Sequence, residues 1–152
     1  MKRLLFLLMA AGLLLSLCAC GMSYTAVPEL KLSWGMTKEE ILKTSENSMD
    51  ELESDGTAYL RSHDGEVLPK VNGMSITWYR CYFDENGGLK QVDVKFLEED
   101  PSIVFNALKS KYGNVTSSGY TFGVWEKKDV VVVDNVAFGV QGFVSYYSPD
   151  IW

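Results

Sequence analysis

The alternation of apolar and polar positions predicts two helices, each followed by a set of β-strands. The first helix begins at Thr37 and runs to about Ser48. Thr37 and Glu40 have the spacing of a capping box, in which each side chain binds a backbone amide that the helix start leaves free. The second helix begins at Asp100 and Pro101, a capping side chain followed by a proline suited to the first helical position.

Strands are predicted where β-branched and aromatic residues alternate with polar ones. Residues 90–96 give the clearest case, because Val92, Val94 and Phe96 alternate with polar neighbours, and one face of this strand is therefore expected to meet solvent. An Asp-Gly pair that begins at Asp64 is typical of a two-residue hairpin turn. Strands are expected at residues 57–61, 74–83, 90–96, 120–126, 130–133 and 138–147, and residues 67–71, interrupted by Pro69, are expected to continue the pairing of the first strand.

The order of these elements suggests that the second half of the chain repeats the first. Helix-then-three-strands occurs at about residues 34–97 and again at about 100–147, although the two halves share no detectable residue identity. Antiparallel hairpins with one helix before each set predict an α+β fold, in which the two units form a sheet with the helices packed on one face. Residues 31–152 are predicted to be a single domain, and residues 20–30 a short spacer.

Residues 1–19 have the features of a secretory signal peptide and not of the folded domain. Lys2 and Arg3 form a positively charged start, and residues 4–17 are a nearly unbroken apolar run. This run is too short to cross a membrane, which takes about 20 apolar residues. The leader therefore predicts export.

The end of this leader, Leu17-Cys18-Ala19-Cys20 followed by Gly21, resembles the lipobox of bacterial lipoproteins. The resemblance implies cleavage before Cys20 and lipid on that cysteine. Cys18 is a competing acceptor, but it follows leucine where the lipoprotein peptidase family requires a small side chain. An ordinary signal peptide cut nearby is the alternative.

The lipobox resemblance also implies a location. Acyl chains contribute about 0.8 kcal/mol per buried methylene, so two chains would hold the protein on the outer side of the cell membrane. Gly21 does not resemble the aspartate-type signal for retention in the inner membrane. In a cell with two membranes the expected destination is therefore the outer one.

Composition restricts the partners and the chemistry of the exported part. Removal of residues 1–19, which hold two basic and no acidic residues, changes the net charge from −6 to −8, so nucleic acid is an unsuitable partner. Cys81 is the one cysteine after Cys20, and it is predicted to be a buried strand residue, because a free cysteine behaves as a small hydrophobe. His63 is the sole histidine, so neither a zinc site nor a cofactor is expected.

No residue set typical of an enzyme occurs in the sequence. It lacks a nucleophile elbow and a phosphate-binding glycine loop. The acidic residues at 39–40 and 98–100 lie at predicted helix starts, where a carboxylate is stabilised by the helix dipole by about 0.3–1 kcal/mol. The prediction is a protein without catalytic residues.

Aromatic residues are the remaining candidates for function. Neighbouring strand residues point to opposite faces, so Trp78 and Tyr79 cannot share one core, and one sheet face should carry aromatic side chains. Exposed Trp and Tyr are typical of interaction surfaces. The predicted binding face consists of Trp78, Tyr82, Trp125 and Tyr146. The alternative is that a helix or a neighbouring chain covers these side chains.

Several stretches resemble a group of small uncharacterised bacterial lipoproteins. These are the Trp-Gly-Met-Thr-Lys-Glu-Glu of residues 34–40, the Lys-Tyr-Gly of residues 111–113, Trp125, and the Tyr-Tyr-Ser-Pro of residues 146–149. In fold the chain is similar to the β-lactamase inhibitor protein and to the small lipoprotein of outer-membrane barrel assembly. The resemblance implies binding of a protein or peptide rather than catalysis, and it carries over no contact residue. The other function considered is an envelope hydrolase or a small-molecule-binding accessory lipoprotein.

Overall fold

The computed structural model describes residues 24–54, 57–63, 65–119, 122–137 and 139–152. These residues form an eight-stranded antiparallel sheet, a two-stranded sheet and two α-helices, which makes the fold mostly β and confirms the α+β class. The predicted leader, the predicted lipidation site Cys20 and Asp64 of the predicted hairpin turn lie outside the described residues.

The elements follow one another along the chain with these bounds. The α-helices are α2 (Lys38–Thr44) and α3 (Pro101–Tyr112). The large sheet consists of β3 (Met49–Ser54), β4 (Thr57–Ser62), β5 (Ile76–Phe83), β6 (Leu89–Phe96), β7 (Ser117–Ser118), β8 (Phe122–Glu126), β9 (Val131–Ala137) and β10 (Val140–Tyr147). The small sheet consists of β1 (Thr25–Val27) and β2 (Leu32–Ser33), joined by the 3-10 helix η1 (Pro28–Leu30), and a second 3-10 helix, η2 (Pro149–Ile151), follows β10.

The large sheet is made of two antiparallel meanders that meet at its centre. The strand order is β3-β4-β5-β6-β10-β9-β8-β7, so each helix is followed by four strands, not by the three that the sequence predicts. The additional strands are β3, in a stretch expected to be irregular, and the two-residue β7. The strand expected at residues 67–71 is absent from the described chain, where Val71 forms only an isolated bridge with Met74.

The predicted helix starts are confirmed. The Thr37 side chain accepts a hydrogen bond from the amide of Glu40, and the Glu40 carboxylate accepts one from the amide of Thr37, so the capping box is complete. The helix ends at Thr44, one turn earlier than expected. Asp100 caps α3 by accepting from the amide of Ser102 at 2.9 Å, with Pro101 at the first position.

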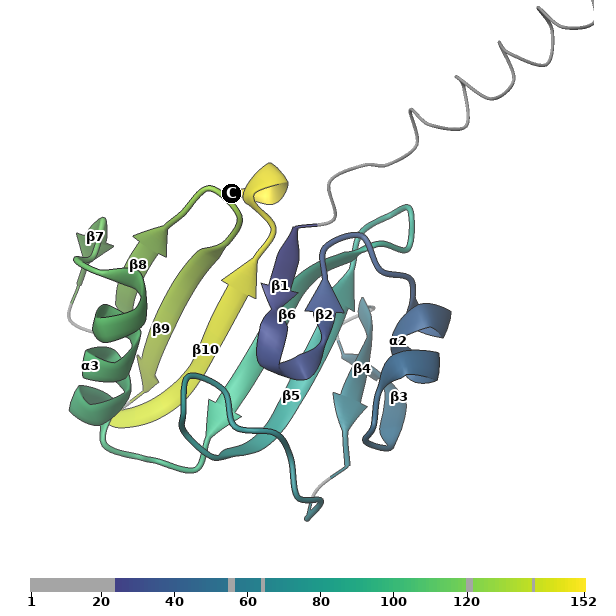
Figure 1. Ribbon diagram of the computed structural model, residues 1–152, viewed down its shortest axis with the longest axis horizontal. Coiled ribbons are helices and arrows are strands. Elements are labelled where there is room, and N and C mark those ends of the chain that lie inside the picture. Colours follow the sequence, from purple (N-terminus) through teal and green to yellow (C-terminus); the bar gives the residue numbers. More distant parts are fainter. Residues whose placement is uncertain (1–23, 55–56, 64, 120–121, 138) are drawn as a thin grey trace, which may run out of the picture.

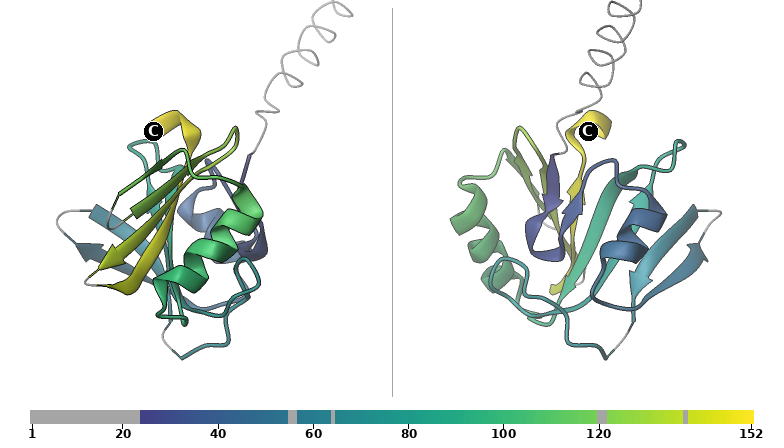
Figure 2. Two further views of the ribbon diagram at one scale, coloured as in Figure 1. Left: turned by 90° about the vertical axis from the view of Figure 1, so that its left-hand side faces the viewer. Right: turned by 45° about the vertical axis from the view of Figure 1, so that its right-hand side comes forward.

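Both helices and the β1–β2 hairpin lie on one face of the large sheet, here called the inner face, which is turned toward the viewer in Figure 1. The two further views in Figure 2 show the same layering from the side. The helices bury Ile41, Val104 and Leu108 against this face, and β6 contributes Val92 and Phe96 among others. A single main core therefore lies between the sheet and these elements.

The N-terminal boundary of the domain differs from the prediction. Ala26, Val27 and Leu30 are buried in the main core, with 3%, 1% and 8% of their surface exposed. The domain therefore includes η1 and the β1–β2 hairpin, and residues 25–30 are not the spacer that was expected. The prediction failed because two short strands show too few alternating positions to be recognised.

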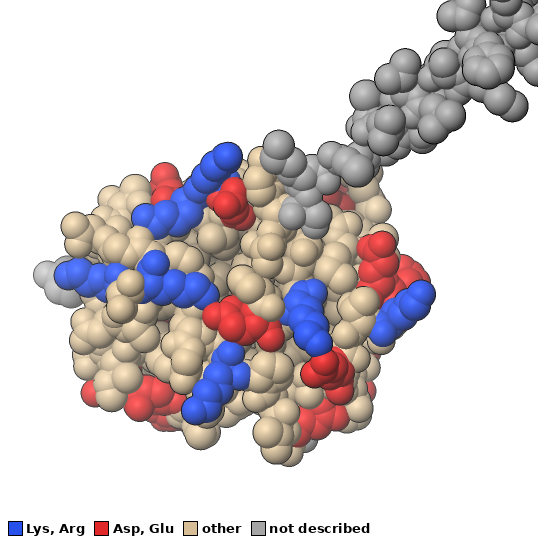
Figure 3. Space-filling view, in the orientation of Figure 1, with Lys and Arg blue, Asp and Glu red and all other residues tan. Residues whose placement is uncertain are grey.

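The surface over the inner face carries mixed charge. In Figure 3, Lys and Arg side chains alternate with Asp and Glu around the molecule, without a broad area of one sign. Neither helix of the described residues has the length and apolar content required to cross a membrane.

Candidate functional site: the outer face of the sheet

The structure separates the four aromatic residues that the sequence grouped into one binding face. Trp78 and Tyr82 lie half-buried on the face opposite the helices, here called the outer face. Trp125 and Tyr146 instead belong to the main core, with 0% and 1% of their surface exposed. The predicted face is therefore wrong for these two residues, which no partner could reach.

The polar atoms of both buried aromatic side chains are satisfied within the core. The indole nitrogen of Trp125 donates to the carbonyl of Gly113 at 2.9 Å, and its ring packs against Phe105 at 5.3 Å between ring centres. The hydroxyl of Tyr146 accepts a hydrogen bond from Asn72 Nδ2 at 2.9 Å. These contacts join α3, β8 and β10, so both residues have structural roles.

The centre of the outer face is an aromatic and arginine cluster around Trp78. The guanidinium carbon of Arg80 lies 4.4 Å from the ring centre of Trp78, and that of Arg61 lies 5.5 Å from it. Phe143 of β10 approaches the same indole at 6.5 Å. Such contacts between a cation and an aromatic face contribute about 0.5–1 kcal/mol at exposed sites. We call Tyr59, Arg61, Trp78, Arg80, Tyr82 and Phe143 the Trp78 cluster.

Two like charges oppose each other in this cluster. Arg61 of β4 pairs directly with Arg80 of β5 in the sheet register. Like charges at directly opposite positions destabilise a sheet. Arg61 and Arg80 are also the only arginines outside residues 1–19, although the chain has 14 basic residues in total.

Asp93 supplies the acidic group closest to this cluster. It pairs with Arg80 across β5 and β6, and its Oδ1 accepts hydrogen bonds from Gln91 Nε2 at 2.9 Å and Ser145 Oγ at 2.8 Å. Burial raises the pKa of Asp93, and these hydrogen bonds and the charge of Arg80 only partly oppose that effect. The alternation of β6 predicted a solvent-facing aspartate, but Asp93 is buried by its neighbours on the outer face.

The outer face continues across β8, β9 and β10 as an apolar surface. Val124, Val131 and Val133 form a second cluster with Tyr147, separate from the main core. Neither α-helix contributes to this cluster within the described residues. The three valines are nearly buried, with at most 9% of their surface exposed, although no described α-helix lies over this face (Figure 2).

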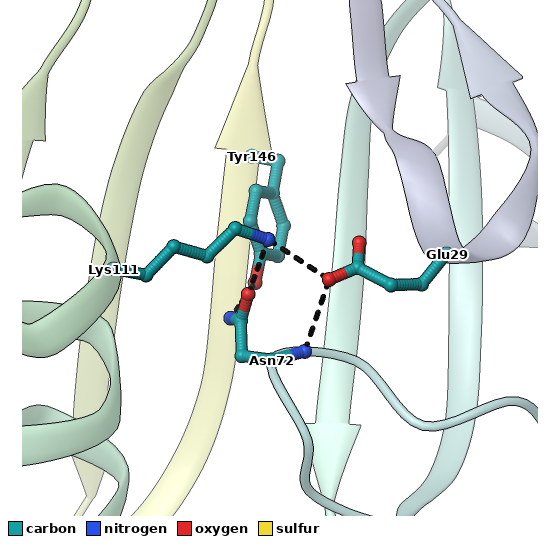
Figure 4. Close-up of polar contacts among 4 residues, drawn as sticks. All are labelled: Glu29, Asn72, Lys111 and Tyr146. Carbon is teal, nitrogen blue, oxygen red and sulfur yellow. Dashed lines mark hydrogen bonds and ion pairs between the residues drawn. The ribbon is translucent and has the colours of Figure 1, made fainter.

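A second group of polar residues lies on the inner face, between η1, α3 and β10 (Figure 4). Lys111 Nζ forms an ion pair with Glu29 Oε1 at 2.9 Å and also donates to Asn72 Oδ1. The amide of Asn72 donates to the same Glu29 oxygen at 3.2 Å, and its side chain reaches Tyr146. These contacts join η1, the loop that carries Asn72, α3 and β10.

The titratable groups of this cluster are stabilised by one another rather than set up for reaction. Burial opposes ionisation of Glu29, but hydrogen bonds from Lys111 and Asn72 outweigh it and lower the pKa of the carboxyl. Burial raises the pKa of Tyr146 well above its ordinary value. The cavity lined in part by Glu29 holds only about 30 Å³, which is room for one water molecule. We conclude that these contacts stabilise the fold.

Substitution of Lys111 by methionine is expected to lower the free energy of unfolding by about 1–2 kcal/mol, because it leaves the partly buried Glu29 without its cation. Since the folded pKa of Glu29 lies below 4.5, its ionised form stabilises the fold above that pH and loses this effect as the pH falls. The difference in the free energy of unfolding between the variant and the original protein should therefore decrease as the pH falls. Urea denaturation at pH 7 and at pH 3.5 measures both effects.

The matched control for this experiment is Lys109→Met. Lys109 is exposed on the same helix and forms no ion pair with another described residue. Its substitution should change stability little at either pH. An equal loss in both variants would show that the contact with Glu29 does not stabilise the protein.

The remaining candidate groups have structural explanations. Cys81 is fully buried in β5, and burial raises the pKa of its thiol, which confirms the predicted structural role. His63 lies at the surface with its Nε2 2.7 Å from Asp50 Oδ1. Within the described ranges, no group of three or more His, Cys, Asp or Glu side chains could hold a metal ion.

Comparison with known proteins does not assign a function to these residues. No protein-family model, curated protein or solved structure matches the chain.

Proposed function

We propose that the protein is a lipid-anchored lipoprotein of the cell envelope, without catalytic activity, that binds another protein through the outer face of its sheet. The lipid is proposed on Cys20, and this proposal depends on the lipobox-like sequence of residues 17–20. The architecture is proposed to derive from two similar units, α2 with β3–β6 and α3 with β7–β10, joined through their last strands.

The observation that carries the binding proposal is the Trp78 cluster on an uncovered sheet face. Tryptophan, tyrosine and arginine are the residue types most enriched at the energetic centres of protein interfaces. Here they come from the adjacent strands β4 and β5, with Phe143 from β10, so the sheet holds them in fixed positions. An interface with rigid anchors loses little conformational entropy when a partner binds.

The charge of the cluster indicates which side chains the partner presents. Arg61 and Arg80 lie side by side above Trp78, in an exported chain whose net charge is otherwise strongly negative. A guanidinium group forms paired hydrogen bonds with a carboxylate, which a point charge such as that of lysine does not. The proposed partner therefore presents Asp or Glu beside an apolar patch that covers Trp78 and Phe143.

Site-specific photo-crosslinking in intact cells tests this function. A photoreactive phenylalanine analogue replaces Phe143, which is 36% exposed on the outer face, or Ile103, which is 48% exposed on α3. We expect one recurrent crosslinked protein from position 143 and none from position 103. Crosslinking should decrease about tenfold with Arg80→Ala, the loss expected when one hydrogen-bonded charge pair is removed.

The control separates loss of the site from loss of the fold. Arg80→Lys keeps the charge but removes the planar group that stacks on Trp78, so it should restore crosslinking only in part. Both variants must retain the thermal midpoint of the original protein within a few degrees. Equal crosslinking from the two faces, or crosslinking that Arg80→Ala leaves unchanged, would rule out the Trp78 cluster as the binding site.

A further inference from the structure

A cleft lies on the inner face, between the start of α3 and the strands β8 and β9. Its volume is about 390 Å³, within the range of small-molecule sites. Its walls are apolar on two sides, with Phe105 and Pro101 from α3 and Phe122 and Val136 from the sheet.

One carboxylate lies in the lining of this apolar cleft. Asp134 of β9 points to the inner face, and only 1% of its surface is exposed. Its Oδ1 accepts a hydrogen bond from Gln141 Nε2 at 2.8 Å. Among the described residues no lysine, arginine or histidine forms an ion pair with Asp134. A buried carboxylate without a cation is costly, since neutral hydrogen bonds replace its hydration only in part.

Two other shielded carboxylates among the described residues each have a cation nearby. Glu29 has Lys111 as its partner, and Asp93 has Arg80 across the sheet. Burial raises the pKa of Asp134, and the hydrogen bond from Gln141 is the one contact that opposes this effect. No cation accompanies Asp134 among the described residues, and the cleft beside it leaves space for a molecule that carries one.

We propose that this cleft binds a small organic cation, a protonated amine on an apolar body, with the ammonium group on the carboxylate of Asp134. The apolar body lies against Phe105 and Val136, and the ring of Phe105 also favours a nearby cation. Ser102, Asn106 and Ser118 line the same cleft and offer further hydrogen-bonding groups. Phe105 is held in place by the buried ring of Trp125, so the cleft is formed before the ligand binds.

Calorimetric titration of the full-length protein in detergent tests the proposal with two probes of nearly equal shape. The probes are phenethylamine, which is charged at pH 7, and 2-phenylethanol, which is neutral. We expect the amine to bind about tenfold more tightly than the alcohol, which corresponds to one added charge-assisted contact. Asp134→Asn should remove this preference and leave the affinity for the alcohol almost unchanged.

Two phenylalanine variants keep the test decisive if Asp134→Asn does not fold. Phe105→Ala removes the aromatic wall of the cleft and should weaken both probes severalfold, whereas Phe143→Ala, a partly exposed residue on the outer face, should weaken neither. The proposal is overturned if the amine does not bind, if the alcohol binds as tightly, or if the two phenylalanine variants behave alike. The readout is independent of the proposed protein partner, so either proposal can fail without the other.

Discussion

Replacement of Trp125 by alanine is expected to lower the free energy of unfolding by about 3–5 kcal/mol, the range for a fully buried tryptophan. Trp125 has no exposed surface, and its ring contacts Phe105 of α3. The substitution leaves a cavity between helix and sheet, and it also leaves the carbonyl of Gly113 without the indole donor. Since small domains are stable by only about 5–15 kcal/mol, the variant should be close to unfolding at 37 °C.

Urea denaturation followed by far-UV circular dichroism measures this loss, with Trp152→Ala as the matched control. Trp152 is 57% exposed and contacts Tyr147 at 5.4 Å between ring centres. Its removal should cost less than about 1 kcal/mol, the value of one aromatic pair. If both substitutions cost the same, the inner-face position of Trp125 is wrong, and the residue would return to the candidates for binding.

Replacement of Cys20 by alanine is expected to move the protein from the membrane fraction to the soluble fraction. The proposed lipid is the reason, because two acyl chains bury many methylene groups at about 0.8 kcal/mol each, and the substitution removes all of them at once. Metabolic labelling with a clickable palmitate analogue, followed by membrane fractionation, reports lipidation and location in one experiment. In the Cys20→Ala variant, both the palmitate label and the amount of protein in the membrane fraction should fall to background.

Cys18, two residues before Cys20, supplies the control for this prediction. Cys18→Ala keeps the small residue before Cys20 and should leave labelling and membrane location unchanged. Labelling that persists in Cys20→Ala but disappears in Cys18→Ala would assign the lipid to Cys18. Absence of labelling in the original protein would contradict a lipoprotein and favour an ordinary signal peptide.

Local signals in the sequence were sufficient for the helices and for most of the strands. The start of α2 follows from the spacing of Thr37 and Glu40, and that of α3 from Asp100 and Pro101, because capping involves only residues within one turn. The strand β6 follows from its alternation, which places Val92 and its apolar neighbours in the core. Each of these features is encoded within a few residues.

The faces of Trp125 and Tyr146 could not be assigned in this way. In β8 both faces are apolar, since Val124 packs on the outer face and Trp125 in the main core, so alternation does not distinguish them. Tyr146 and Tyr147 are adjacent aromatic residues that necessarily point to opposite sides. Which of the two is buried depends on the pairing of β10 with β6, a contact between segments distant in the sequence.

The same limit applies to the Trp78 cluster and to the cleft. Arg61 and Arg80 show no common motif in the sequence, and they become neighbours only through the register of β4 with β5. Asp134 occurs in a sequence pair that suggests a turn, but the chain continues through it as β9. A search for charged residues within predicted strands, rather than in loops, would have selected Arg61 and Arg80, but not Asp134, which follows the strand predicted at residues 130–133.

The acidic strand β3 has a consequence for how closely these molecules can approach one another. It forms one edge of the large sheet, and it carries Asp50, Glu51 and Glu53, all of them exposed. The opposite edge, β7, is only two residues long. Exposed edges invite strands of other copies to pair with them, and charge or shortness at the edge prevents it. If a lipid confines the protein to a membrane surface, where copies share one orientation and collide often, these edges would protect it from aggregation.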